Sequence, residues 1–347
     1  MSGSYQKTKV GIAGVTGYTG EEVLTWLLKH PRVELSYVAA SEDVGSLANR
    51  LPRWADVPGI PACEGLNAQR MAGSCDVALL ALPHTQSMAV VPGLLKAGVR
   101  VVDLSADYRL REAPVYEKWY QHAHTDTANI ANAVYGLCEY CGEELKQAQL
   151  VANPGCYPTA VSLALLPLLK SDLYSGGTVI VDAKSGVTGA GRKVAAALQF
   201  SEVNENLKAY KVAVHQHTPE MLQTLKDFSG FDSSLVFVPH LIPMNRGIVA
   251  TCYVPLKAPS TSAELKALYE TAYAQAPFVR IKAKGEAPET AQVAHTNYCD
   301  IGVFADESGN TAVVISAIDN LAKGAATQAI QNLNRMMGWP ETEGLLR

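Results

Sequence analysis

Apolar runs and amphipathic stretches alternate along the first part of the chain. The runs are apolar along almost their whole length, which is typical of parallel strands that are buried on both faces. Helical periodicity lies between them, at Gly20–Lys29 and Thr85–Ala97. The predicted strands are Lys9–Ala13, Val33–Ala39, Asp76–Ala81 and Val99–Asp103. This order predicts an α/β fold whose first domain, residues 1–152, is a doubly wound, Rossmann-type dinucleotide-binding domain.

The pattern changes after a short predicted strand, Leu150–Ala152. A strongly apolar helical stretch, Pro158–Lys170, comes next, and a second helix is predicted at Ser262–Tyr273. Longer β segments surround that helix, at Thr178–Lys184, Leu235–Pro239, Ile248–Pro255, Tyr298–Phe304 and Thr311–Ala317. We expect them to form a mixed, largely antiparallel sheet in an α+β catalytic and oligomerisation domain, residues 153–318. A final helix, Leu321–Met336 with Asn320 near its cap, is expected to pack back on the first domain as part of residues 319–347.

Composition and charge exclude several classes of protein. The 347 residues are 48% hydrophobic and 18% charged, as in globular proteins. The 29 Lys and Arg against 33 Asp and Glu provide no basic surface for a phosphate backbone, so we expect no nucleic-acid partner. No apolar run reaches the ~18 residues of a membrane span. The polar start of the chain and its odd number of cysteines, seven, favour reduced thiols in the cytoplasm.

A glycine-rich turn follows the first predicted strand directly. Gly11, Gly14, Gly17 and Gly20, with Thr16 and Tyr18 between them, open the first helix. Glycines let the backbone approach a pyrophosphate there, and the amino end of the helix stabilises its charge. The turn therefore predicts a dinucleotide site, although its spacing is G-x-x-G-x-x-G.

The end of the second predicted strand bears on the choice of nicotinamide cofactor. Ser41 suits a 2′-phosphate, whereas the neighbouring Glu42 and Asp43 oppose one. Arg50 or Arg53 could compensate for this charge, and the residues alone leave the choice open.

Cys156 is the candidate nucleophile. It lies between a strand end and a helix start, where amide groups and the helix dipole lower a thiol pKa. Cys63, Cys75, Cys252 and Cys299 are interpreted as small buried hydrophobes. Cys138 and Cys141 form a C-x-x-C pair, but no second Cys or His pair has the spacing of a zinc finger, so chance is favoured.

His215 and His217 are the candidate acid and base, since histidine titrates near neutral pH. In an extended segment they would lie on one side, and Glu220, just inside a predicted helix, could orient one of them. We favour His215 for proton transfer and His217 for binding. A metal at this H-x-H, or at His122 and His124, is not expected.

Planar bidentate donors suit an acyl phosphate and a carboxylate. Arg109, Arg192 and Arg246 lie in predicted loops and are candidates for this role, together with Asn153. The glycine-rich loop that starts at Ser185 and Gly186 could donate amides to the cofactor, and the strand end at Pro83 and His84 faces the cofactor edge of such sheets.

The whole chain resembles the N-acetyl-γ-glutamyl-phosphate reductase family, within the semialdehyde dehydrogenase and glyceraldehyde-phosphate-dehydrogenase-like superfamily. The most specific segment is Val151-Ala-Asn-Pro-Gly-Cys156-Tyr-Pro-Thr-Ala160. Other matching segments, in order, are Gly11–Gly20, Ala81–His84, Asp103–Arg109, Lys184–Arg192, His215–Glu220, Pro239–Gly247 and Asp319–Ala325.

The resemblance implies a function. It implies that NADPH reduces N-acetyl-γ-glutamyl phosphate to N-acetylglutamate semialdehyde, with release of phosphate, in arginine biosynthesis. It further implies a thioacyl intermediate on Cys156, no metal, and a homodimer or homotetramer. It also implies that Asn320 contacts the nicotinamide amide. Two alternatives remain: the same chemistry on aspartyl phosphate or a carrier-bound aminoadipyl phosphate, and a non-catalytic nucleotide-sensing protein on this fold.

Overall fold

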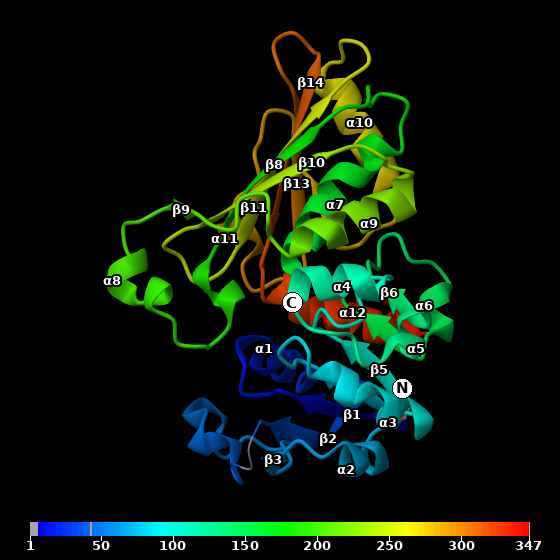
Figure 1. Cartoon of the computed structure of the whole chain (residues 1–347), viewed down its shortest axis with the longest axis vertical. Coiled ribbons are helices and arrows are strands. Elements are labelled where there is room, and N and C mark those ends of the chain that lie inside the picture. Colours follow the sequence, from blue (N-terminus) through cyan, green and yellow to red (C-terminus); the bar gives the residue numbers. More distant parts are fainter. Residues whose placement is uncertain (1–5, 42–43, 347) are drawn as a thin grey trace, which may run out of the picture. The chain divides into compact units, whose positions relative to one another are not determined.

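The computed structural model describes residues 6–41 and 44–346, and the chain divides into two compact units (Figure 1). Unit 1 holds the chain up to Pro154 together with the stretch from Ala325 onward, and unit 2 holds Gly155–Gly324. The sequence placed these boundaries after Ala152 and Ile318, so the chain changes units slightly later at each crossing. Nowhere in the described ranges does a helix have the length and apolar character needed to cross a membrane.

Unit 1 is built on a parallel sheet whose strand order is β3-β2-β1-β4-β5-β7-β6. The order reverses between β1 and β4, and open α/β sheets bind ligands at that point, outside the carboxyl ends of the strands. This confirms the predicted doubly wound fold. The strands are β1 (Thr8–Ala13), β2 (Val33–Ala40), β3 (Cys63–Gly65), β4 (Val77–Leu80), β5 (Arg100–Asp103), β6 (Ala133–Tyr135) and β7 (Leu150–Ala152).

The edge strands β3 and β6 were not predicted, because three residues are too few to show a period. The helices of unit 1 are α1 (Tyr18–Leu27), α2 (Ala68–Ser74), α3 (Val91–Lys96), α4 (Ala113–Tyr120), α5 (Thr127–Ile130), α6 (Glu144–Gln147) and α12 (Thr327–Met336), with short 3₁₀ turns η1 (Leu47–Asn49), η2 (Pro52–Trp54) and η3 (Ser87–Ala89).

The helix predicted over Thr85–Ala97 is wrong in its first half. Thr85 has a φ of 76°, in the left-handed region, and α3 starts only at Val91. The amides of Thr85 and Ser87 donate to the carboxylate of Asp107 instead of entering a helix. A side chain distant in the sequence therefore sets the conformation of this turn.

The predicted final helix begins as a π-helical turn, η6 (Ala322–Ala326), and becomes α-helical at Thr327. Its first amides are not capped by Asn320. Oδ1 of Asp319 accepts hydrogen bonds from the amides of Leu321 and Ala322, at 2.8 and 3.1 Å. In unit 1, α12 contacts α1, α6 and β5.

Unit 2 contains a mixed sheet in the order β12-β13-β14-β11-β8-β10-β9. The pairs β12–β13 and β8–β10 are parallel, and the other neighbours are antiparallel, which confirms the predicted largely antiparallel sheet. The strands are β8 (Val179–Ser185), β9 (Lys208–Ala209), β10 (Leu235–Leu241), β11 (Ile248–Pro255), β12 (Val279–Ile281), β13 (Cys299–Ala305) and β14 (Thr311–Ile318).

Helices cover one face of the unit 2 sheet, where Figure 1 shows α7, α9 and α10 together. Alternate strand residues point to this face and are buried, as Val181, Phe237 and Val314 are. A capping box of Thr261 and Glu264 starts α10. The helices are α7 (Cys156–Leu169), α8 (Phe200–Val203), α9 (His217–Ser229), α10 (Ser262–Ala272) and α11 (Thr290–Val293), with 3₁₀ turns η4 (Val187–Ala190) and η5 (Ala196–Leu198).

The opposite face of this sheet carries an apolar row. Val236 pairs with Ile180, Ile180 with Tyr253, Tyr253 with Val313, and Val313 with Phe304. Ile180 is 44% exposed, and Val236 and Tyr253 are each 39% exposed. We call these five residues the open-face row.

A buried polar network lies beyond the carboxyl end of β5 in unit 1. Asp103 is fully buried, and its carboxylate accepts hydrogen bonds from the hydroxyls of Ser87 and Ser105, each at 2.7 Å. Burial and, to a smaller extent, the nearby charge of Asp107 raise the pKa of Asp103 to about 6, against the hydrogen bonds from the two serines, which act in the opposite direction. The folded protein therefore binds a proton at Asp103 more tightly than the unfolded chain does.

This linkage predicts a pH-dependent stability difference between the wild type and Asp103→Asn. The favourable contribution of Asp103 is fully present below pH 3.8 and is lost as the pH rises through about 6. The asparagine variant lacks this titration, so its stability relative to the wild type should rise over that range by on the order of 3 kcal/mol. Urea unfolding of both proteins from acid to neutral pH measures the difference. A difference that does not change with pH would contradict the buried, proton-binding carboxyl.

Candidate active site

Cys156 is the first residue of α7, two residues before the predicted helix start. Gly155, the N-cap, is extended with φ −68° and ψ 158°, so the chain turns into the helix directly at the cysteine. The thiol therefore lies at the positive end of the helix dipole, among amides that have no partner within the helix. This position favours the thiolate form of Cys156.

The other cysteines have different surroundings. All seven cysteines fall within the described residues, and Cys156 is the one that is only half-buried. Burial raises the pKa of Cys75 and of Cys141 to about 12, and it also raises the pKa of Cys252. These thiols stay protonated at neutral pH.

The C-x-x-C pair is part of the core of unit 1. The thiol of Cys138 donates to Oδ1 of Asn332 at 2.9 Å, and that of Cys141 donates to the carbonyl of Tyr135 at 2.7 Å. Within residues 6–41 and 44–346, no three or more His, Cys, Asp and Glu side chains gather as metal ligands would.

His215 is buried in an aromatic cluster of unit 2. Its ring lies 5.4–5.6 Å from the rings of Tyr157, Tyr210 and Phe237, with interplanar angles between 73° and 89°. Burial, with a smaller contribution from the charge of Lys211, lowers the pKa of His215 to about 4. His215 is therefore neutral throughout the physiological range.

The segment between the two histidines is a turn, and the extended conformation predicted for it is wrong. Gln216 has α-helical dihedral angles, and α9 starts at His217. The two rings still lie together, with centroids 4.9 Å apart. The amide of His217 donates to Nδ1 of His215 at 3.1 Å, so the neutral His215 ring carries its proton on Nε2.

Glu220 lies in the first turn of α9 and is 1% exposed. Its Oε1 accepts a hydrogen bond from the amide of Gly155 at 2.8 Å. The sequence assigned Glu220 to orienting an imidazole. That role stays a prediction. The hydrogen bond to Gly155 fixes the residue that precedes Cys156, so Glu220 also links α9 to the start of α7.

Two tyrosines complete this cluster and were not predicted. The hydroxyls of Tyr157 and Tyr210 are 3.2 Å apart, and the Tyr157 side chain also hydrogen-bonds Ser185. Burial raises the pKa of Tyr210 to about 12 and raises that of Tyr157, so both remain protonated donors. The charge of Cys156 contributes to both shifts in the same direction. Tyr157 follows Cys156 directly in the sequence, which was the available signal.

Gly324 was also missed as a site residue. A Cβ atom built on it would lie 2.8 Å from Cβ of Cys156, closer than such atoms approach in proteins. Gly324 lies in the π-helical turn η6, a distortion that is frequent at functional sites. The absence of a side chain at Gly324 makes room for the cysteine.

The three predicted arginines have different environments. Arg246 donates to the buried Asp319 at 2.9 Å and contacts Nδ1 of His295 at 3.0 Å. Arg109 is buried, and its Nε and Nη2 donate to the carbonyls of Asn153 and Leu104, each at 2.8 Å. Arg192 is exposed in the loop after η4.

Two predicted asparagines make hydrogen bonds within their own units. Asn153 is fully buried: its Oδ1 accepts from Asn332 at 3.0 Å and its amide donates to the carbonyl of Ala325 at 3.1 Å. In unit 2, Oδ1 of Asn320 accepts from the amide of Gly247 at 2.8 Å, and its amide donates to the hydroxyl of Thr188 at 3.1 Å. These contacts favour positioning roles for both residues.

The glycine-rich turn of unit 1 fits a dinucleotide, but Gly11, which was predicted to belong to it, is a buried residue within β1 and packs against Met71 and Cys75. Gly14 has a φ of +84°, and a Cβ on it would lie 2.2 Å from the carbonyl oxygen of Ala81. A Cβ on Gly20 would lie 2.1 Å from the carbonyl oxygen of Gly14. The backbone is therefore packed against the end of β4, and the amino end of α1, capped by Gly17, starts at the switch point between β1 and β4.

The remaining predicted cofactor residues are only partly described. Ser41 and Pro83 are exposed, and Glu42 and Asp43 lie outside the described residues. Arg53, suggested as a compensating charge, forms an ion pair with Glu21 at 2.6 Å. In unit 2, Gly186 is packed so closely that a Cβ would lie 2.6 Å from the carbonyl oxygen of Asn245.

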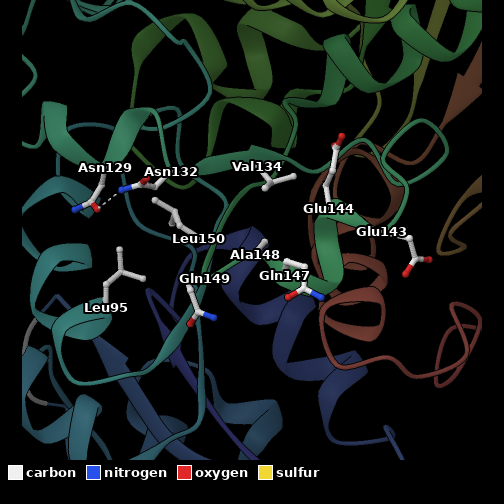
Figure 2. A pocket seen from close by; sticks show the side chains of 10 residues that line it. All are labelled: Leu95, Asn129, Asn132, Val134, Glu143, Glu144, Gln147, Ala148, Gln149 and Leu150. Carbon is white, nitrogen blue, oxygen red and sulfur yellow. Dashed lines mark hydrogen bonds between the residues drawn. The ribbon is translucent and has the colours of Figure 1, made fainter.

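An open depression of about 780 Å³ lies elsewhere on unit 1. It adjoins the amino end of β7, whereas cofactors bind at the carboxyl ends of such strands. Figure 2 shows Asn129 and Asn132 on one side of it and Glu143 and Gln147 on the other. None of the predicted site residues lines it.

Comparisons with known proteins match both units. Residues 9–148 match the family model "Semialdehyde dehydrogenase, NAD binding domain", and residues 156–320 match "Semialdehyde dehydrogenase, dimerisation domain". A protein of Symbiobacterium thermophilum named N-acetyl-gamma-glutamyl-phosphate reductase is 48% identical over 344 residues, covering 97% of each chain. The protein of that name from Geobacillus sp. is 46% identical over 338 residues, covering 97% of this chain and 98% of the relative. This chain belongs to the N-acetyl-γ-glutamyl-phosphate reductase family.

Solved structures of other proteins share the fold of this reductase at much lower sequence identity. Aspartate semialdehyde dehydrogenase II from Vibrio cholerae, complexed with ASA, superposes with a TM-score of 0.73 at 17% identity, covering 96% of this chain and 99% of that one. The aspartate semialdehyde dehydrogenase from Candida albicans, solved with NADP, has a TM-score of 0.66 at 14% identity, covering 96% and 99%.

Proposed function

We propose that this protein catalyses the NADPH-dependent reduction of N-acetyl-L-γ-glutamyl phosphate to N-acetyl-L-glutamate 5-semialdehyde, with release of phosphate, in arginine biosynthesis. The observation that carries the proposal is the placement of Cys156 at the first position of α7, directly before Tyr157, whose ring contacts the neutral His215. Relatives of the whole chain with this family name support the substrate assignment.

The proposed chemistry follows from the thiol. The Cys156 thiolate attacks the acyl carbon, the carbon–oxygen bond to phosphate breaks, and a thioester and free phosphate result. When bound, NADPH supplies the hydride that reduces the thioester carbon. The aldehyde then leaves as the carbon–sulfur bond breaks and the thiolate returns, so charges and atoms balance.

His215 assists at the oxygen of the acyl group. With Nδ1 engaged by the amide of His217, Nε2–H is the donor that stabilises the oxyanion by a hydrogen bond. Tyr157 and Tyr210, both protonated, are further donors beside the thiol. Glu220 acts through Gly155, by holding the start of α7.

Residues of each unit are proposed for binding. In unit 1, the glycine-rich turn, Ser41 and Pro83 hold NADP(H), at the point where the strand order reverses. In unit 2, Ser185, Gly186 and Asn320 remain predictions for the cofactor, and Arg192 and Arg246 remain predictions for the phosphate and carboxylate groups of the substrate. For Arg109 and Asn153 we propose positioning in place of substrate contact, because both are buried and bonded to unit 1.

We also propose that two copies associate through the open-face row of unit 2. The matched family model is described as a dimerisation domain, and an uncovered apolar row on a sheet is the kind of surface that a second copy buries. The seven free cysteines support a cytoplasmic location, where thiols stay reduced.

The function is tested in reverse, with the purified protein, N-acetylglutamate semialdehyde, phosphate and NADP⁺. NADPH should form only when phosphate is present, and aspartate semialdehyde and carrier-bound aminoadipate semialdehyde should react far more slowly.

Cys156→Ser should abolish turnover but leave NADPH binding intact, because the nucleophile is in unit 2 and the glycine turn is in unit 1. Cys252→Ala, at a buried cysteine of unit 2, is the control and should stay active.

If either of the other two semialdehydes reacted faster, that compound would be assigned as the substrate. Absence of phosphate-dependent NADPH formation with all three would favour a nucleotide-sensing protein. A Cys156→Ser enzyme with more than a few per cent of wild-type activity would remove the nucleophile assignment.

The two histidines should separate kinetically. His215→Asn should lower kcat by about 10²–10³-fold, because oxyanion stabilisation acts in the transition state. His217→Asn should mainly raise KM. Because the pKa of His215 is about 4, the wild-type rate should show no ionisation of this residue between about pH 5 and pH 8. The opposite pattern of kcat and KM would exchange the two roles.

Association is tested by measuring the mass of the protein in solution by light scattering. The wild type should have at least twice the mass of one chain. Ile180→Glu places a charge in the middle of the open-face row and should give monomers, whereas Leu346→Glu, at an exposed position of unit 1, should not. A wild-type monomer, or an Ile180→Glu protein with unchanged mass, would rule out this surface.

A further inference from the structure

The turn between β4 and α3 has an unusual conformation at the proposed cofactor edge of unit 1. Thr85 is β-branched and has a φ of 76°, a combination that is a genuine outlier for L-residues. Such strain persists only when the surrounding structure enforces it, and it is concentrated at ligand sites. Here the strain is enforced by Asp107, which lies on a different segment of the chain.

Asp107 enforces this conformation. Its fully buried carboxylate accepts the amide of Thr85 at 2.7 Å on Oδ1 and the amide of Ser87 at 2.9 Å on Oδ2. The hydroxyl of Tyr116 also donates to Oδ1 at 2.7 Å and orients the carboxylate from the far side. The Asp107 side chain thus holds the backbone of the turn at both Thr85 and Ser87.

Neighbouring contacts reinforce the same turn. The hydroxyl of Ser87 donates to Asp103 at 2.7 Å, and the amide of Ala106 donates to Nδ1 of His84 at 3.1 Å. The His84 ring also packs edge-on against Tyr120, with centroids 5.3 Å apart. We call residues His84–Ser87 the clamped turn.

The clamped turn lies at the switch point of the sheet. β1 and β4 are adjacent and parallel, and the strand order reverses between them. The turn after β1 is the glycine-rich turn, and its Gly14 packs against the carbonyl of Ala81, just before the clamped turn. A ligand bound outside these two strands therefore has the glycine-rich turn on one side and the clamped turn on the other.

We propose that Asp107 is a positioning residue for the dinucleotide: by binding the amides of Thr85 and Ser87, it fixes the clamped turn as one wall of the cofactor crevice. This rests on the proposed function, since it requires that unit 1 binds NADP(H). Asp107 acts through the clamped turn. Its side chain is fully buried, so it does not itself touch the cofactor.

The test is direct titration of the full chain with NADPH, followed by the fluorescence of the nicotinamide, which needs no substrate and no turnover. In Asp107→Asn, the amide nitrogen of the new side chain replaces one acceptor, so a buried backbone amide loses its partner. The dissociation constant should rise by between about fivefold and a hundredfold. In the reverse assay, KM for NADP⁺ should rise while KM for phosphate stays unchanged.

Asp126→Asn is the matched control. Asp126 is a buried carboxylate of the same unit, but it accepts hydrogen bonds from Tyr108 and Asn129. Its replacement should lower thermal stability without changing NADPH affinity. If both variants lose stability and both bind NADPH as the wild type does, Asp107 is merely structural and the proposal fails.

Rescue gives the sharpest result. Glycine adopts a positive φ without strain, so Thr85→Gly in the Asp107→Asn background should recover much of the lost affinity. No recovery would show that Asp107 acts by another route. Should Asp107→Asn fail to fold, Tyr116→Phe removes only the hydroxyl that orients the Asp107 carboxylate and should weaken NADPH binding several-fold, and unchanged binding would overturn the proposal.

Titration of the wild type with NADPH distinguishes failure of the positioning role from failure of the proposed function. If the wild type binds NADPH and Asp107→Asn binds it equally well, only the positioning role fails. If the wild type does not bind NADPH at all, the proposed function fails, and the positioning role fails with it.

Discussion

The start of α7 at Cys156 is the constraint on which the proposed chemistry depends. A thiol at the first position of a helix gains its reactivity from the aligned amides behind it, so the chain has to turn into the helix at that residue. Glu220 accepts the amide of Gly155 and holds this entry, and Gly324 leaves the space that the Cβ of Cys156 occupies. Three segments distant in the sequence thus cooperate to place one sulfur atom.

Burial favours the neutral form of ionisable groups in both units, with different effects on the protein. In unit 2 it keeps His215 neutral and keeps Tyr157 and Tyr210 protonated, which provides uncharged hydrogen-bond donors beside a thiolate. In unit 1 it raises the pKa of Asp103, which lies beside the carboxylate that anchors the turn after β4. Desolvation therefore keeps the hydrogen-bond donors of unit 2 uncharged. In unit 1 the same effect lowers the stability of the folded protein, because the carboxylates that hold the turn are buried.

Errors in the sequence-based prediction cluster where distant side chains control the backbone. The helix predicted from Thr85 fails because Asp107 binds the amides that would have formed its first turn. The extended H-x-H segment fails because α9 starts at His217, yet the two imidazoles still meet. Asn320 was expected to cap the final helix, but Asp319 does so, and Asn320 instead joins Gly247 to Thr188.

The sequence by itself determined the two sheets, the position of the glycine-rich turn and the candidate nucleophile. Continuous apolar strands, glycines directly after β1 and a cysteine between a strand and a helix are local patterns with local causes. Only the tertiary structure decided what surrounds these groups: which imidazole is buried, which nitrogen carries its proton, and that Arg109 and Asn153 bind backbone and side chains of their own unit. Desolvation and hydrogen-bond partners come from residues far apart in the chain, and no local pattern encodes them.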